Sequence, residues 1–225
     1  MPAIEFVIRG RQKTFEVRDL VIAGWTGRDP ATVEHHIAEL AAIGVARPRS
    51  IPCFYRLGAN LLTTSTYLDF TGSDSSGEAE FVLVSMPEGI FVGVGSDHTD
   101  RKVESYGVTV SKQMCPKPIS HELWPLAELL AHWDKLVLRS WVTRDNGTLL
   151  YQQGEVTRML PPMDLISRYS EGDGTLPVGT VMFCGTMPLL AEMGAARHFE
   201  MELEDPVLGR SLRHGYTARE LPYND

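Results

Sequence analysis

Short runs of apolar residues, many of them alternating with polar ones, recur along most of the chain. This pattern is typical of strands that turn one face toward a core. It predicts strands over Ile4–Ile8 and Thr14–Val21, joined by a turn at 10–13. An irregular segment with proline and aromatic residues follows at 50–64, and residues 65–118 then read as successive strands separated by turns. We therefore expect β-structure over much of the first half.

Three segments have the apolar spacing of a helix. The first, near 29–44, begins with Asp-Pro, a favoured helix start, and ends at a glycine. The second is predicted over Ser120–Trp133, which requires Pro125 to fall within its first turn. A third, shorter helix is predicted over Pro162–Tyr169.

The second half returns to strand-like patterns. Asn146-Gly147 is a favoured hairpin turn, and it predicts a hairpin between Lys135–Thr143 and Thr148–Gln152. Further strands are predicted over Thr180–Thr186, His198–Leu203 and Leu208–Thr217. Many short strands with few helices predict a mainly β fold with a few helices, of the α+β class.

Composition narrows the class of protein. The chain has 225 residues, of which 43% are hydrophobic and 22% charged, so it can bury a substantial core. We divide it into a small N-terminal strand region, 1–28, and a larger domain, 29–225. The net charge of −8 argues against binding to nucleic acid or to an anionic membrane surface. The three cysteines are far apart, which favours a reducing compartment, and we expect a cytoplasmic protein.

Three carboxylates indicate a site for a hard cation. Glu78 and Glu80 project from the same side of one predicted strand, and Asp97 follows a second apolar run, Gly89–Gly95. Like charges on one face of a strand repel unless a cation lies between them. Oxygen ligands of this kind suit Mg²⁺, Mn²⁺ or Ca²⁺. The alternative is that the two glutamates line a solvated strand face.

From the helix near 29 almost to its end, the chain resembles the fumarylacetoacetate hydrolase superfamily, and within it a bacterial branch. The matching motifs are Glu78-Ala79-Glu80, Asp97-His98-Thr99-Asp100-Arg101, Lys112 before Pro116, Asn146-Gly147 followed by Gln152 or Gln153, and Gly185-Thr186 after an apolar strand. The resemblance implies a mixed β-roll or sandwich and a homodimer. It also implies Mg²⁺ or Mn²⁺ held by Glu78, Glu80 and Asp97.

The resemblance further implies roles for the residues around the metal. The catalytic residues would be Lys112 and a His36–Glu39 pair on a lid helix near 29–44, although the adjacent His35 and Glu34 leave that assignment open. Of the predicted substrate-binding residues, Arg101, Gln152, Gly185 and Thr186 lie in or beside the matching motifs. Arg56 lies outside them and is predicted from its planar guanidinium, which suits a substrate carboxylate; the alternative is an ordinary surface cation.

The chain departs from the superfamily pattern where a substrate would lie. Met187 interrupts the Gly-Thr-Pro element, Thr180 stands where the superfamily has an aspartate, and His98 replaces an aliphatic residue. These departures leave the substrate open, and with it the question of whether His98 joins the site.

These observations favour a divalent-metal-dependent hydrolase or lyase that acts on a small 2-oxo or 1,3-dicarbonyl acid through a metal-bound enolate. Carbon–carbon hydrolysis, decarboxylation, hydration and isomerisation all suit this arrangement, and the sequence does not choose between them. The alternative is a protein that binds the metal and an oxo acid but has lost catalysis.

Overall fold

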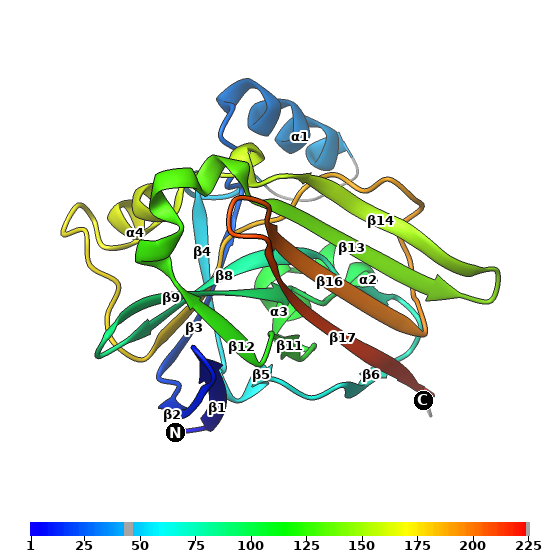
Figure 1. Cartoon of the computed structure of the whole chain (residues 1–225). Helices are drawn as coiled ribbons and strands as arrows, with labels where there is room; N and C mark the ends of the chain where they lie inside the picture. Colours follow the sequence, from blue (N-terminus) through cyan, green and yellow to red (C-terminus); the bar gives the residue numbers. More distant parts are fainter. Residues whose placement is uncertain (43–46, 224–225) are drawn as a thin grey trace.

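Two β-sheets form the framework of the molecule (Figure 1). The computed structural model describes residues 1–42 and 47–223, apart from the side chains of residues 36, 39, 40 and 42. The larger sheet has the strand order β2-β1-β12-β9-β8-β15-β3-β4. Its strands are β1 (Ala3–Ile8), β2 (Arg11–Glu16), β3 (Asp19–Gly24), β4 (Cys53–Leu57), β8 (Ala79–Met86), β9 (Gly89–Ser96), β12 (Glu122–Pro125) and β15 (Thr180–Phe183).

The smaller sheet has the order β14-β13-β16-β17-β6. Its strands are β6 (Tyr67–Thr71), β13 (Val137–Arg144), β14 (Gly147–Glu155), β16 (His198–Asp205) and β17 (Arg210–Leu221). Two short pairs complete the β-structure, β5 (Leu62–Thr63) with β11 (Lys117–Pro118) and β7 (Ser75–Ser76) with β10 (Thr99–Asp100). The prediction of a mainly β fold with a few helices is confirmed.

The helices are short and lie around the sheets. They are α1 (Pro30–Ala42), α2 (Arg101–Glu104), α3 (Val108–Gln113) and α4 (Pro162–Tyr169). Single 3-10 turns lie at Ala59–Leu61, Leu126–Glu128 and Val156–Arg158, and a longer 3-10 stretch covers Leu130–Lys135. In Figure 1, α1 stands at the top of the molecule, at the end opposite both termini. No helix in the described part of the chain is long and apolar enough to span a membrane.

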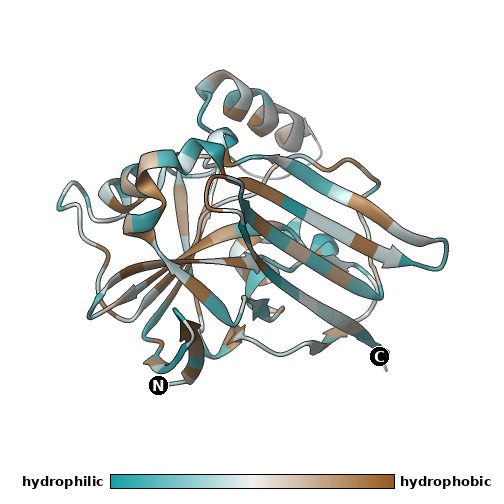
Figure 2. Ribbon diagram, in the orientation of Figure 1, coloured by the Kyte–Doolittle hydropathy of each residue, from teal (hydrophilic) through white to brown (hydrophobic). Residues whose placement is uncertain are grey.

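Strand β8 lies between two apolar cores, and this explains why its residues are all buried. Phe81 and Leu83 join the core shared with the smaller sheet, whereas Val82 and Val84 join the core that includes Phe6 of β1. Figure 2 shows the resulting apolar colouring of the central strands. By the alternation of a strand, Glu80 projects to the same side as Val82. A carboxylate is therefore built into an apolar layer.

Several local predictions are confirmed. Helix α4 begins at its proline and covers the predicted residues. The predicted hairpin is β13–β14, and Gly147 adopts φ +108° at its turn, a conformation that glycine tolerates. The predicted strand over Thr14–Val21 is two strands instead, because the chain turns between β2 and β3, where the Arg18 amide donates to the Gly179 carbonyl at 2.9 Å.

The predicted helix over Ser120–Trp133 is wrong. Its first part is strand β12, which pairs with β1 and β9 and buries Leu123 and Trp124, and 3-10 turns follow. Pro125 ends the strand, since it can neither donate to the ladder nor lie inside a helix. Residues 101–113 form α2 and α3 rather than strands, and Asp100 caps α2 by accepting from the Val103 amide at 2.9 Å.

The N-terminal strands are part of the larger sheet. β1 and β2 form one edge of it, and β3 lies between β15 and β4. Each strand of this region therefore shares its backbone hydrogen bonds with the framework, directly or through β1. The division of the chain at residue 28 stays a prediction.

Candidate metal centre

Three carboxylates converge where β8 begins and β9 ends. Glu78 precedes β8, Glu80 is its second residue, and Asp97 follows the last residue of β9. One oxygen from each side chain lies within 4.8 Å of the others. The pairing of β8 with β9 sets this geometry, because Glu80 lies opposite Gly95 and the Asp97 amide donates to the Glu78 carbonyl at 3.0 Å. The structure thus brings together the residues of the predicted triad.

This carboxylate triad fits a hard divalent cation. All its donors are oxygens, the ligands that Mg²⁺ and Mn²⁺ prefer. Asp97 is 1% exposed, and its Oδ1 accepts no hydrogen bond within the described residues. Lys117 Nζ lies 3.4 Å from that oxygen. A buried anionic oxygen without a hydrogen bond is costly unless a cation compensates it, so the donor set matches a metal ligand set.

Glu80 is held by the turn after β15. It is 2% exposed, and its Oε2 accepts a hydrogen bond of 2.7 Å from the Gly185 amide. Burial raises the pKa of Glu80 well above its ordinary value, and Asp97 raises it further, although Lys112 acts in the opposite direction. Burial and Asp97 therefore favour the protonated form of Glu80 as long as no metal ion is bound beside it.

Two lysines face Asp97 from the following segments. Lys112 Nζ on α3 donates to Asp97 Oδ2, and Lys117 on β11 faces the other oxygen. Burial alone would raise the pKa of Asp97, but the two ammonium groups outweigh it and hold that pKa below its ordinary value. Burial alone would lower the pKa of Lys112, and Asp97 and Glu78 outweigh it and raise that pKa. Asp97 is therefore anionic beside two cations.

Arg101 contacts the third carboxylate. Its Nη2 lies 3.2 Å from Glu78 Oε1, and its Nε donates to Ser76 Oγ at 2.8 Å. Glu104 lies 3.3 Å from Nη1, so two carboxylates share this guanidinium. The contact shows that Arg101 orients Glu78, while its role in binding substrate stays a prediction.

The hydrogen-bonding groups of Gln152 are all engaged with protein. Its Oε1 accepts from the Ala79 amide and Ser140 Oγ, at 2.9 and 2.8 Å, and its Nε2 donates to Thr186 Oγ1 and the Met187 carbonyl, at 2.7 and 2.8 Å. Gln152 is also fully buried. These contacts point to a role in fixing the 185–187 turn against β8. The neighbouring Gln153 is exposed.

The hydrogen-bond donors of the Gly185–Thr186 turn are likewise engaged with protein groups, those of strand β8. The Gly185 amide donates to Glu80, and Thr186 Oγ1 donates to the Ala79 carbonyl at 2.8 Å. The described structure therefore shows both groups supporting the triad strand, and a contact with a substrate carboxylate stays a prediction.

Arg56 lies apart from the triad. Its guanidinium carbon is 5.9 Å from the ring centre of Tyr169 on α4, and the side chain is exposed. The adjacent Tyr55 points to the opposite face of β4. Its hydroxyl accepts from Trp25 Nε1 at 3.2 Å, burial raises its pKa to about 12, and the charge of Lys112 lowers that pKa in part. Tyr55, rather than Arg56, is therefore the residue of this strand that lies toward Lys112.

His98 is enclosed behind the triad. It stacks on Phe70, with ring centres 3.9 Å apart, and its ring nitrogens contact Tyr216 and Ser75 at 2.7 and 2.9 Å. Burial lowers the pKa of His98 well below its ordinary value, and Lys117 lowers it further. This neutral, fully bonded imidazole supports the loop that carries Asp97.

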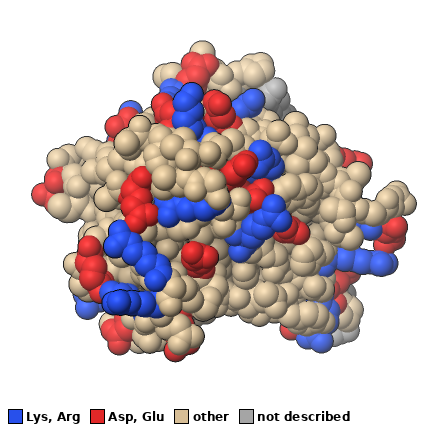
Figure 3. Space-filling view, in the orientation of Figure 1, with Lys and Arg blue, Asp and Glu red and all other residues tan. Residues whose placement is uncertain are grey.

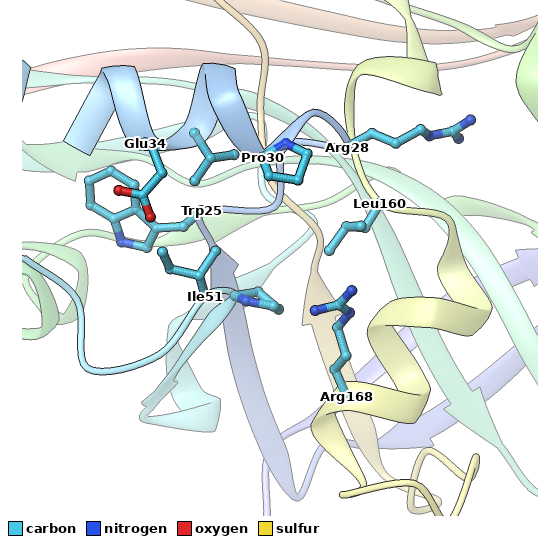
Figure 4. A pocket seen from close by; sticks show the side chains of 10 residues that line it. Trp25, Arg28, Pro30, Glu34, Ile51, Leu160 and Arg168 are labelled. Carbon is cyan, nitrogen blue, oxygen red and sulfur yellow. The ribbon is translucent and has the colours of Figure 1, made fainter. Parts of the chain in front are cut away.

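The side chains of His36 and Glu39 lie outside the described residues, as does the predicted helix end at Gly44. The described part of α1 buries Val33 and Ile37, and a pocket of about 120 Å³ lies beneath its first turns. Figure 4 shows Trp25 and Ile51 on one side of this pocket, with Arg168 reaching toward it from α4. None of the three carboxylates lines it.

Sequence reasoning missed Lys117, Tyr55 and Trp25. Lys117 lies between two prolines, a context that resembles an exposed turn, so no local signal distinguishes it. Tyr55 follows from strand alternation once the face of Arg56 is known. Trp25 has φ +61°, which no sequence pattern for a non-glycine residue predicts.

Comparisons with known proteins place this geometry in context. A family model described as "Protein of unknown function (DUF2848)" matches residues 23–216. A search of curated proteins gave no match.

Solved structures show the same fold. A protein proposed to be a fumarylacetoacetate isomerase/hydrolase, from Oleispira antarctica, is 18% identical, with a TM-score of 0.67, covering 96% of this chain and 100% of its own. A fumarylpyruvate hydrolase from Pseudomonas aeruginosa, in complex with Mn²⁺ and pyruvate, is 19% identical, with a TM-score of 0.63 and coverage of 98% and 97%. A 2-keto-3-deoxyarabinonate dehydratase is 12% identical, with a TM-score of 0.63 and coverage of 93% and 77%. The fold expected from the resemblance is confirmed.

Proposed function

Since the chain belongs to the DUF2848 family of proteins of unknown function and has the fold of fumarylacetoacetate hydrolase family proteins, we propose that it is a divalent-metal-dependent hydrolase or lyase of small oxo acids. The observation that carries this proposal is the carboxylate triad, in which Glu80 and Asp97 are buried and one oxygen from each side chain lies within 4.8 Å of the others. Asp97 Oδ1 accepts no hydrogen bond in the described residues. Glu78, Glu80 and Asp97 would hold Mg²⁺ or Mn²⁺. The ion would supply Lewis-acid polarisation of a substrate carbonyl.

The charges around the triad favour an anionic substrate. Four carboxylates, those of the triad and Glu104, face the three cations of Arg101, Lys112 and Lys117. With these groups ionised, the formal sum is −1, and a divalent cation changes it to +1. An acid with a carboxylate beside its carbonyl group suits such a site, because it offers two oxygens to the open positions of a hard cation and one negative charge to the cluster.

We propose that Lys112 acts on the substrate. Its side chain is 8% exposed, and its ammonium donates to Asp97, with a weak second contact to Thr99 Oγ1 at 3.5 Å. A cation in that position would stabilise negative charge that develops on a substrate oxygen. Tyr55 keeps its hydroxyl proton at neutral pH, since burial raises its pKa to about 12. We propose that His36 and Glu39 activate water or deliver a proton.

Solved structures of this fold include proteins named as a hydrolase and as a dehydratase, so the pocket rather than the fold selects the reaction. We therefore propose 2-oxo and 1,3-dicarbonyl acids as the substrate class. The test is a screen of such acids with Mg²⁺ or Mn²⁺, read as release of pyruvate or CO₂ or as loss of enol absorbance.

Glu80→Gln is the matched control for this screen. The amide oxygen of the glutamine can still accept from Gly185, so we expect a folded protein that binds neither Mg²⁺ nor Mn²⁺ in calorimetry and turns over nothing. Unchanged metal affinity in Glu80→Gln would contradict the metal centre. A wild type that binds the metal and an oxo acid without converting any would instead favour the non-catalytic binding protein.

A further inference from the structure

The two lysines at Asp97 differ in how they are held. Lys112 Nζ bonds side chains, those of Asp97 and more weakly Thr99, and lies at the edge of the buried cluster. Lys117 is 0% exposed, and its ammonium donates to the carbonyls of His98 at 2.5 Å, Lys112 at 2.6 Å and Cys115 at 3.0 Å. Its three N–H groups therefore all donate to backbone oxygens. The same Nζ lies 3.4 Å from Asp97 Oδ1, as an ion pair.

These contacts join the two loops that form the site. The His98 carbonyl belongs to the loop after β9, which carries Asp97, and the other two carbonyls belong to the end of α3 and the loop before β11. Lys117 itself is anchored by the pairing of β11 with β5. Its ammonium thus fixes the backbone next to Asp97 against the segment that carries Lys112.

Resting on the function proposed above, we infer that Lys117 is a positioning residue: its ammonium group orients Asp97 as a metal ligand. Its charge also balances Asp97 when Lys112 turns to a substrate. Lys117 touches neither metal nor substrate in this role, because every donor it has is engaged with backbone.

Substitution of Lys117 distinguishes a positioning role from a purely electrostatic one, because the two roles predict opposite changes in the affinity for a divalent cation. If Lys117 were only a positive charge near the site, Lys117→Met would bind a divalent cation more tightly, because a repulsion is removed. If Lys117 positions Asp97, the same variant binds more weakly, by about 10- to 100-fold, as is typical when a residue that orients a metal ligand is lost. Lys112→Met provides the contrast, since losing its competing contact with Asp97 should strengthen metal binding.

The experiment is calorimetric titration of Mn²⁺ into folded wild type, Lys117→Met, Lys112→Met and the exposed-surface control Lys102→Met, with the metal-induced rise in melting temperature as a second readout. Lys102 is 74% exposed and should match the wild type. We expect weaker binding and a smaller temperature rise for Lys117→Met alone. Affinity equal to or above that of the wild type in Lys117→Met would overturn the inference.

Chemical rescue separates a positioning role from a role in folding. Lys117→Ala leaves space beside three carbonyls and a carboxylate, and ethylammonium should restore Mn²⁺ affinity where tetramethylammonium, which has no N–H donor, does not. Failure of both Lys117 variants to fold, with or without ethylammonium, would show that the residue serves folding alone and would overturn the inference. Absence of Mn²⁺ binding in the wild type would instead refute the metal centre itself, and this role with it.

Discussion

At the scale of single residues, the site is a set of buried charges whose partners decide their state. Asp97 is held anionic by two lysines, while burial and the neighbouring Asp97 favour the protonated form of Glu80. His98, directly after Asp97, is kept neutral by burial. Adjacent groups in one small volume therefore have their pKa values displaced in different directions, a pattern more typical of functional sites than of ordinary surface ion pairs.

The buried His98 should make the metal-free protein sensitive to acid. Its pKa is lowered well below 6.5 in the native state, so below about pH 6.5 the unfolded chain binds a proton that the native imidazole refuses. Native stability should therefore fall as the pH drops, by up to about 1.4 kcal/mol per pH unit for this one group. His98→Leu should lower stability at pH 7.5 by about 1–3 kcal/mol, because Ser75 and Tyr216 lose a partner, and should flatten this slope.

Urea unfolding between pH 7.5 and 5.0, in the presence of EDTA, measures the slope. His214 has a lowered pKa for the same reason, burial, and so part of the slope should remain in the variant. Glu80 acts with the opposite sign, since its raised pKa stabilises the native state as the pH falls toward 4.5. Lys102→Met, which changes a side chain that is 74% exposed and no histidine, is the control and should keep the wild-type slope. Identical slopes in His98→Leu and wild type would contradict the prediction.

At the scale of elements, the turn after β15 connects the sheet to the site. Gly185 adopts φ +93°, and a Cβ there would overlap the Thr26 hydroxyl. Gly185→Ala should therefore cost backbone strain of about 1–2 kcal/mol plus the clash. It should also weaken Mn²⁺ binding, because the displaced amide no longer orients Glu80. Gly172→Ala is the matched control, since Gly172 has φ +97° with no atom near its Cβ position.

Chemical denaturation and calorimetry check this pair of variants. Gly172→Ala should show the backbone strain alone and unchanged metal affinity. Equal destabilisation by both substitutions, with equal Mn²⁺ affinity, would mean that the close approach to Thr26 has no energetic consequence and that the turn does not support Glu80.

Elements defined by local chemistry were predictable from the sequence, and those defined by tertiary pairing were not. Helix α4 and the β13–β14 hairpin carry their own signals, a proline at the helix start and Asn-Gly at the turn. The segment 120–133 has apolar residues that also suit a helix, and only its place between β1 and β9 makes it a strand. The triad was predictable because strand alternation and motif order fix it. Lys117 was not, because its partners are backbone carbonyls.

At the scale of the whole molecule, ion pairs join cationic and anionic side chains on the surface. Figure 3 shows Lys and Arg lying next to Asp and Glu on the face displayed, and ion pairs such as Arg9–Glu128 and Arg219–Asp69 have this mixed character. The net charge is −8. The expectation that the chain binds neither nucleic acid nor an anionic membrane surface stays a prediction.

We also expect a homodimer, as the resemblance to the fumarylacetoacetate hydrolase superfamily implies. Light scattering at micromolar concentration should give twice the 25.0 kDa of one chain. The Glu80→Gln variant should give the same mass, because its substitution lies in the buried site. A particle of one chain's mass in both proteins would contradict the expectation.

The final prediction concerns α1 as a lid over the metal centre. Asp29 caps this helix by accepting from the Ala31 amide at 3.1 Å. Val33 and Ile37 are buried on its inner face, and Val33 lines the pocket. If α1 closes when a chelating acid binds, hydrogen–deuterium exchange of its backbone amides should be slower in the presence of Mn²⁺ and oxalate than in the presence of Mn²⁺ alone. Closure would exclude all water from the site except the molecule that is activated for the reaction.

Substitution of the lid histidines connects this motion to catalysis. His36→Ala should lower turnover by a factor of about 10²–10⁴, the usual contribution of general acid–base catalysis, and leave Mn²⁺ affinity unchanged, because the carboxylates supply the ground-state contacts. His35→Ala is the paired variant, since the sequence leaves open which histidine acts. The one with the larger loss of kcat identifies the active residue. Equal exchange in α1 with and without oxalate, together with full activity of both variants, would show that the helix is scaffold.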